Sequence, residues 1–154
     1  MSLYAIGDLH LSFQSDKSME AFGEEWKNYS YKIKRNWCSI VKETDTVVVT
    51  GDHSWGKKLP DSMKDLEFIA ALPGKKILLR GNHDRFWNKI NKTESLNELF
   101  AGRLLFLQNN FYEYEDNNSG KKYALIGSSP EIVALNLAKI SLAGSRSWMS
   151  VRFF

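Results

Sequence analysis

The sequence predicts an α/β fold built on a mainly parallel sheet. Short apolar runs, each followed closely by a glycine, alternate with longer segments of helical periodicity in a β-α-β-α-β order. Parallel neighbours need a crossover connection, which is usually a helix, so this alternation favours parallel pairing. With 154 residues and 43% hydrophobic content, the chain is long enough for one domain with a core.

The strands are expected where almost wholly apolar runs indicate burial on both faces of a sheet. These runs are Leu3 to Ile6, Thr46 to Thr50, Lys76 to Leu79 and Tyr123 to Ile126. Leu104 to Leu107 and Phe111 to Glu115 also predict strands. The turn residues 116–120 predict that Phe111 to Glu115 forms a hairpin with the segment ending at Ile126.

Helices are expected between these strands. Residues 19–41 carry apolar side chains near helical spacing, and Pro60 opens a second helix that Pro73-Gly74 ends. A third amphipathic segment runs from about Trp87 to Phe100. Beyond it, the segment 128–154 has no clear strand and turn pattern, and a helix there rests only on Ile132, Leu135 and Leu142.

Composition excludes several classes of protein. The net charge of +3 comes from scattered residues, without the basic block of a dedicated nucleic-acid surface. Cys38 is the only cysteine, which rules out an intrachain disulfide and a cysteine-based zinc cluster and fits a reducing cytoplasm. The N-terminus lacks the features of a secretory signal, and no apolar run approaches the ~20 residues of a membrane-spanning helix. We therefore expect a cytoplasmic protein without a membrane partner.

Polar residues follow the first three predicted strands at Gly7-Asp8, Gly51-Asp52 and Gly81-Asn82. In open α/β sheets, ligands bind at the carboxyl edge of the strands, so these turns should face one crevice. Neither glycine-rich nucleotide-binding motif occurs, which makes a nucleotide-binding module without hydrolysis the weakest alternative.

Asp8 and His10 lie two residues apart, so in an extended segment both side chains point the same way and can grip one divalent ion. A turn aspartate beside an unrelated surface histidine is the alternative for this pair. Asp52 follows Gly51, which permits a sharp turn, and its two carboxylate oxygens can bridge two cations. The alternative for Asp52 is an ordinary Gly-Asp turn.

The cluster Gly81-Asn82-His83-Asp84 is more informative. The Asn82 amide oxygen is a neutral ligand that adds no charge to repel a phosphate. His83 can offer a proton or a hydrogen bond to a departing ester oxygen, and Asp84 would orient that imidazole or cap the next helix. Loop polarity and helix capping remain the alternative.

The three clusters together resemble the first signature blocks of the calcineurin-like metallophosphoesterase family. These blocks are Gly7-Asp8-Leu9-His10, Gly51-Asp52-His53 and Gly81-Asn82-His83-Asp84. Ser54-Trp55, residues 72–76 and Phe86-Trp87 are similar to a prokaryotic serine/threonine-phosphatase-like subgroup, and the likeness covers roughly Met1 to Ile126.

The resemblance implies a four-layer α/β/β/α sandwich, of which this chain holds part. It also implies that Asp8 and His10 hold one metal, that Asp52 bridges two metals, and that Asn82 holds the second. His83 would be the catalytic histidine, assisting the leaving group while a metal-bridging hydroxide attacks a phosphomonoester or phosphodiester. Two divalent ions are implied, Mn²⁺ first, with Fe, Zn or Mg as alternatives.

The sequence also departs from the family pattern. The family uses a later histidine and a Gly-His-x-His block, whereas no histidine follows His83 here. We therefore expect residues 1–127 to be the N-terminal half of a metallophosphoesterase domain and 128–154 an atypical segment, from truncation or a frame change near Gly127. The alternative function is a noncatalytic remnant or half-protein with weak metal binding, whose partner is a separately encoded second half.

Several residues beside the motifs have two interpretations. His53 stands where the subgroup has an apolar residue, and it is expected as a neutral histidine at the crevice edge or as a stray ligand. The aromatic residues Trp55, Phe86 and Trp87 either wall a substrate pocket or pack in the core. Asn82 and Arg85 are the expected substrate contacts, and Arg80 is a weaker one, with surface solvation as the alternative for both arginines.

Overall fold

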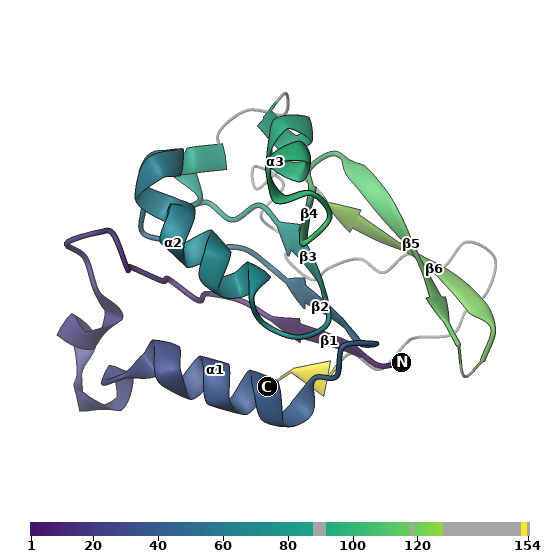
Figure 1. The fold of residues 1–154 in the computed structure, drawn as a ribbon, viewed down its shortest axis with the longest axis horizontal. Helices are drawn as coiled ribbons and strands as arrows, with labels where there is room; N and C mark the ends of the chain where they lie inside the picture. The colour runs from purple at the N-terminus through teal and green to yellow at the C-terminus, as the bar shows by residue number, and fades with distance from the viewer. Residues whose placement is uncertain (88–91, 118, 128–151, 154) are drawn as a thin grey trace.

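The computed structural model describes residues 1–87, 92–117, 119–127 and 152–153 (Figure 1). Its central sheet is parallel throughout, with the strand order β4-β3-β2-β1-β7. The strands are β1 (Leu3–Ile6), β2 (Thr46–Val49), β3 (Lys75–Leu79), β4 (Leu104–Leu107) and β7 (Arg152–Phe153). The α/β fold with a mainly parallel sheet is confirmed.

Both faces of the central sheet are covered, as the apolar runs of β1 to β3 predict. Alternate residues point to opposite faces, so Val47 and Val49 join one core cluster while Val48 joins another. Leu78 and Ile77 of β3 divide in the same way, and all five side chains are at most 5% exposed.

Three helices cover one face of this sheet (Figure 1). They are α1 (Tyr29–Ile40), α2 (Leu59–Ala70) and α3 (Lys92–Phe100). Their apolar stripes supply fully buried side chains to the core, among them Trp37, Leu66, Ile69 and Phe100.

The expected helix over residues 19–41 is wrong in its first part. The chain instead forms two short 3₁₀ helices, η1 (Met19–Phe22) and η2 (Glu24–Trp26), before α1 begins. Gly23 has φ 147° and Asn28 has φ 53°, and these values interrupt a right-handed helix twice. The segment from Trp87 is likewise divided, since Trp87 ends η3 (Arg85–Trp87) and α3 begins at Lys92, with 88–91 outside the described residues.

The predicted hairpin is present and covers the other face of the sheet. Strands β5 (Asn110–Asp116) and β6 (Lys121–Gly127) pair antiparallel, and their inner residues Tyr114, Tyr123 and Leu125 pack on the second core cluster. The expectation that Tyr123 to Ile126 is buried on both faces is wrong. Because the hairpin covers the sheet with one face only, Ile126 is 42% exposed.

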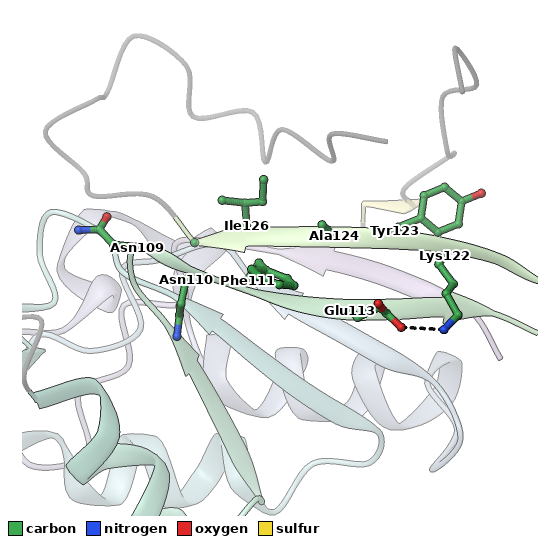
Figure 2. Close-up of a pocket in the computed structure, with 9 residues that line it drawn as sticks. Asn109, Asn110, Phe111, Glu113, Lys122, Tyr123, Ala124 and Ile126 are labelled. Atoms are coloured by element: carbon green, nitrogen blue, oxygen red, sulfur yellow. Dashed lines mark hydrogen bonds and ion pairs between the residues drawn. The ribbon is translucent and has the colours of Figure 1, made fainter. Parts of the chain in front are cut away.

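The outward face of the hairpin holds a shallow hollow (Figure 2). Phe111, which is 66% exposed, and Ile126 contribute its largest apolar side chains. Its other lining residues also belong to β5, β6 and the turn before β5, so the hollow does not involve the turns that follow β1, β2 and β3.

The described residues thus form three layers of helices, sheet and hairpin, consistent with part of a four-layer sandwich (Figure 1). The helix expected around Ile132, Leu135 and Leu142 lies outside them. Within the described part of the chain, every helix is too short or too polar to cross a bilayer. Because β1, β2 and β3 are parallel, the turns that follow them meet at one edge of the sheet.

Candidate metal centre

The chain segments that leave β1 and β2 continue side by side beyond the sheet. The Asp8 amide donates to the Gly51 carbonyl at 3.1 Å, and the His10 amide donates to the Asp52 carbonyl at 2.9 Å. The ladder goes on with Leu11, whose amide bonds the His53 carbonyl at 3.0 Å. These backbone bonds fix residues 8 and 10 directly beside residue 52.

The turn after β3 is held against the same place by a close approach of two glycines. Gly51 has φ 124°, and a Cβ atom built on it would lie 2.7 Å from the Gly81 Cα. Only glycine permits this backbone contact and this φ. The His83 amide then donates to Asp52 Oδ1 at 2.9 Å, so all three predicted clusters share one rim.

Asp8, His10 and Asp52 form a compact group of metal-ligating side chains. Their ligand atoms all lie within 4.8 Å of one another. The His10 Nε2 atom is 3.7 Å from Asp8 Oδ1 and 3.8 Å from Asp52 Oδ2. The distances of 3.7 and 3.8 Å are each shorter than twice the usual metal–ligand distance of about 2.0–2.2 Å, so His10 and either carboxylate can bind one divalent cation together.

The backbone that presents these ligands is not extended, contrary to the sequence-based expectation. Asp8, His10 and Asp52 have φ values of 55°, 44° and 54°, in the left-handed region that residues other than glycine seldom adopt. The two side chains of residues 8 and 10 still converge, but turns bring them together. Such strain persists where surrounding contacts hold it, which here are the ladder and the glycine approach.

Burial changes the pKa of His10 and therefore its protonation state. Its side chain is 12% exposed, and loss of solvent lowers its pKa, with a smaller contribution from His83, although the nearby carboxylates of Asp52 and Asp8 oppose the shift. The net lowering favours the neutral imidazole at neutral pH, which is the form that binds metals.

Asp84 links the turn after β2 to the turn after β3 through hydrogen bonds. Its fully buried carboxylate accepts the amides of Asp52 at 2.9 Å, His53 at 2.9 Å and Gly81 at 2.8 Å. It also accepts a hydrogen bond from His53 Nδ1 at 2.8 Å. Asp84 therefore orients the imidazole of His53, and the expectation that it orients His83 or caps the next helix is corrected.

The position of His53 differs from the expected one as well. Its side chain is 0% exposed, so it lies beneath the rim and not at the crevice edge. A buried imidazole needs a partner for its ring N–H, and Asp84 supplies one. The sequence does contain a signal for the pair of His53 and Asp84. A histidine that closely follows a buried strand is itself buried, and its ring N–H then requires a buried hydrogen-bond acceptor.

Comparison with known proteins places this sequence in a family. The sequence profile described as calcineurin-like phosphoesterase matches residues 1–147. The chain belongs to the calcineurin-like phosphoesterase family. The match extends past Ile126, which is the end of the region in which the sequence motifs resemble the family.

Two relatives of this phosphoesterase cover part of its length. The Gene 66 protein of Mycobacterium phage L5 is 30% identical over 77 residues, which are 50% of this chain and 37% of that protein. The crystal structure of a protein of unknown function, AQ665 from Aquifex aeolicus, is 28% identical, with a TM-score of 0.49 over 82% of this chain and 60% of that one. The chain thus spans less than two thirds of the length of each of these two proteins.

The family is one of phosphoesterases, which typically use divalent metals. The group of two carboxylates and an imidazole at the sheet edge suits the binding of a divalent metal. Two of the aromatic residues that were candidates for a pocket wall lie elsewhere. Phe86 and Trp87 are at most 1% exposed and pack in the core, so they do not wall a pocket.

Other candidate side chains of the phosphoesterase lie at the rim. Asn82 and Arg85 are exposed. Asn82 lies between Gly81, which packs closely against Asp52, and His83, whose amide donates to Asp52 Oδ1. Arg80 is half-buried, and its Nε atom has no hydrogen-bond partner among the described residues. Trp55 is half-buried and stacks on His10 with ring centroids 4.3 Å apart.

Gly81→Ala is expected to weaken the binding of a divalent cation, tested with Mn²⁺, at this group of side chains. A Cβ atom at this position would meet Asp52 Oδ1 and come within 2.9 Å of Asp52 Cγ, so the carboxylate must move. We expect a loss of about 10-fold or more in Mn²⁺ affinity, measured by calorimetry, with a destabilisation of about 1–3 kcal/mol.

Gly102→Ala is the matched control for that change. Gly102 has φ 81° with nothing within 4 Å of an added Cβ, so the substitution strains the backbone without touching the ligands. It should lower stability and leave Mn²⁺ affinity at the wild-type value. Wild-type affinity in Gly81→Ala would show that the close approach does not position Asp52.

Proposed function

We propose that this chain hydrolyses a phosphate ester, either a phosphomonoester or a phosphodiester, with two divalent cations of which Mn²⁺ is the first choice. The observation that carries the proposal is the group formed by Asp8, His10 and Asp52, whose ligand atoms lie within 4.8 Å of one another at the carboxyl edge of the sheet. Residues 1–127 contain the whole group, and residues 128–154 are an atypical C-terminal segment in this proposal.

In this proposal Asp8 and His10 would hold one cation, Asn82 would hold the other, and Asp52 would serve both. Asp52 suits the bridging position, because Oδ2 faces His10 while Oδ1 lies on the side of His83. When bound there, divalent cations would supply a water molecule of lowered pKa as the nucleophile and would neutralise charge on the phosphoryl group. The neutral Asn82 amide adds no repulsion toward that anionic group.

His83 is the residue proposed to assist the departing oxygen. Its ring lies 5.5 Å from the His10 ring, centroid to centroid, and its amide is anchored on Asp52 Oδ1. A half-buried imidazole beside the ligands can donate a hydrogen bond to an ester oxygen as its bond to phosphorus breaks. Arg85, exposed two residues along, is proposed to pair with a phosphate oxygen.

The test is hydrolysis of p-nitrophenyl phosphate and its bis ester with added Mn²⁺. The wild-type chain should release nitrophenol, and a chelator should stop the release. His83→Ala is expected to lower kcat by about 10²–10⁴-fold while Mn²⁺ affinity, measured by calorimetry, stays near wild type. Hydrolysis that survives chelation, or equal rates in wild type and His83→Ala, would remove the proposed site from the reaction.

A noncatalytic half-protein that needs a separately encoded second half is the second candidate. The observation in its favour is that the compact group holds three ligating side chains, Asp8, His10 and Asp52, and that no histidine follows His83 in the sequence. Calorimetric titration distinguishes the two, because a competent centre takes up two Mn²⁺ ions per chain and a half-site takes up one weakly. A reducing cytoplasm suits either candidate, since Cys38 is exposed and is the chain's single cysteine.

A further inference from the structure

Three rings meet at the rim of the metal centre. Trp55 stacks on His10 with a centroid distance of 4.3 Å and an interplanar angle of 16°. The same indole meets the His83 ring edge to face at 5.1 Å, and His10 and His83 are 5.5 Å apart. One tryptophan therefore touches both the proposed ligand and the proposed catalytic histidine.

The indole is itself held from two directions. The Trp55 amide donates to the Leu11 carbonyl at 2.9 Å, so its backbone belongs to the ladder that places His10. The ammonium of Lys17 lies 3.5 Å from the ring centroid. A group this close cannot fit between rings stacked at 4.3 Å, so Lys17 covers the face opposite His10 as a cation–π contact.

Within the described part of the chain, His10 makes no hydrogen bond of the kind that usually orients a metal-binding imidazole. Such a ligand commonly donates its second ring N–H to a carboxylate or carbonyl group, which fixes the ring. Here Nε2 faces Asp8 and Asp52, and the buried Nδ1 atom has no hydrogen-bond partner among the described residues. Of the two ring contacts that His10 makes among the described residues, the stack on Trp55 at 4.3 Å is the closer, so it is the one that holds the imidazole plane.

We infer that Trp55 is a positioning residue of the metal centre, which holds the His10 imidazole in its ligating orientation through ring stacking and keeps His83 at a fixed distance from it. The inference rests on the proposed metal site. An aromatic pair in this geometry is worth about 0.5–1.5 kcal/mol beyond the area it buries. Without the stack, the imidazole can rotate and the ligand set loses its preformed arrangement.

The test compares Trp55→Phe, Trp55→Leu and Trp26→Leu. Phenylalanine keeps a ring that can stack, whereas leucine removes it. Trp26 is a half-buried tryptophan of η2 whose ring contacts Tyr29 at 6.4 Å, and it serves as the matched control. We expect Trp55→Leu to bind Mn²⁺ about 10–100-fold more weakly by calorimetry, with Trp55→Phe and Trp26→Leu within a few-fold of wild type.

Fluorescence supplies a second measurement that needs no activity. Paramagnetic Mn²⁺ should quench Trp55 emission in the wild type, because the indole stacks on a ligand, and the quenching should vanish in Trp55→Phe. Equal Mn²⁺ affinity in Trp55→Leu and wild type, or equal loss in Trp26→Leu, would overturn the inference. If Trp55→Leu does not fold, unchanged quenching in Trp55→Phe would overturn it. Absence of any Mn²⁺ binding in the wild type would instead contradict the proposed function.

Discussion

Asp84→Asn is expected to lower the free energy of unfolding by about 3 kcal/mol, whereas Asp65→Asn should change it by less than about 1 kcal/mol. Both aspartates are 0% exposed. Asp84 accepts four hydrogen bonds from Asp52, His53 and Gly81, so an amide nitrogen in place of either oxygen faces at least one N–H group. Two buried N–H donors that face each other both lack a hydrogen-bond acceptor.

Asp65 is the matched control because its partners tolerate an amide. Its oxygens accept the Phe13 amide at 2.8 Å and the Ser54 hydroxyl, and a hydroxyl can turn to accept from an amide nitrogen. The pKa values of the two carboxyls also shift in opposite directions. Burial raises the pKa of Asp65. Burial alone would raise that of Asp84 as well, but the imidazole of His53 and the donated amides hold it below its usual value.

The signs of these shifts give a pH dependence. A lowered pKa in the folded state means that Asp84 contributes stability above its unfolded pKa of about 3.9, and that this contribution is lost as pH falls through the folded value. Urea unfolding of the metal-free chain at neutral and acidic pH measures both effects. Equal losses in Asp84→Asn and Asp65→Asn would show that Asp84 is not the link between the two turns.

Much of the central sheet follows from local sequence. Strand β1 spans Leu3–Ile6 as predicted, because a run buried on both faces is apolar at every position and its ends are clear. The break before α1 does not follow in the same way. Gly23 and Asn28 adopt positive φ values, and the periodic apolar residues on either side of them suggest one continuous helix. The two-residue strand β7 is too short to leave a pattern in the sequence.

Some features of the candidate site likewise follow from the sequence, and others do not. Glycine-led turns after parallel strands predict that Asp8 and Asp52 meet at one edge, since topology alone brings strand ends together. The bond from His53 to Asp84 and the stacking of Trp55 on His10 depend on how two turns pack in three dimensions. Residue types and spacing do not contain that information, which is why Asp84 was expected to serve His83.

Asp52→Asn is expected to abolish Mn²⁺ binding and phosphate-ester hydrolysis while the fold survives. The amide oxygen can still accept the His83 N–H, so the contact between the turns is kept at 2.9 Å or close to it. The lost feature is the negative charge facing His10 and the second oxygen of the bridge. Removing a group that merely orients a ligand costs about 10–100-fold in affinity, so removing a ligating charge should cost more than about 100-fold.

Metal-dependent stability measures this loss without an activity assay. Mn²⁺ at about 100 times its dissociation constant should stabilise the wild type by about 2.7 kcal/mol, and the same concentration should leave Asp52→Asn almost unchanged. Asp45→Asn is the matched control, because Asp45 is 5% exposed against 8% for Asp52 and accepts the amides of Ser2 and Lys42 far from the ligands. Asp45→Asn should lose intrinsic stability yet keep the full response to Mn²⁺. A full response in Asp52→Asn would mean that the cation binds elsewhere, and the bridging position assigned to this carboxylate would have to be abandoned.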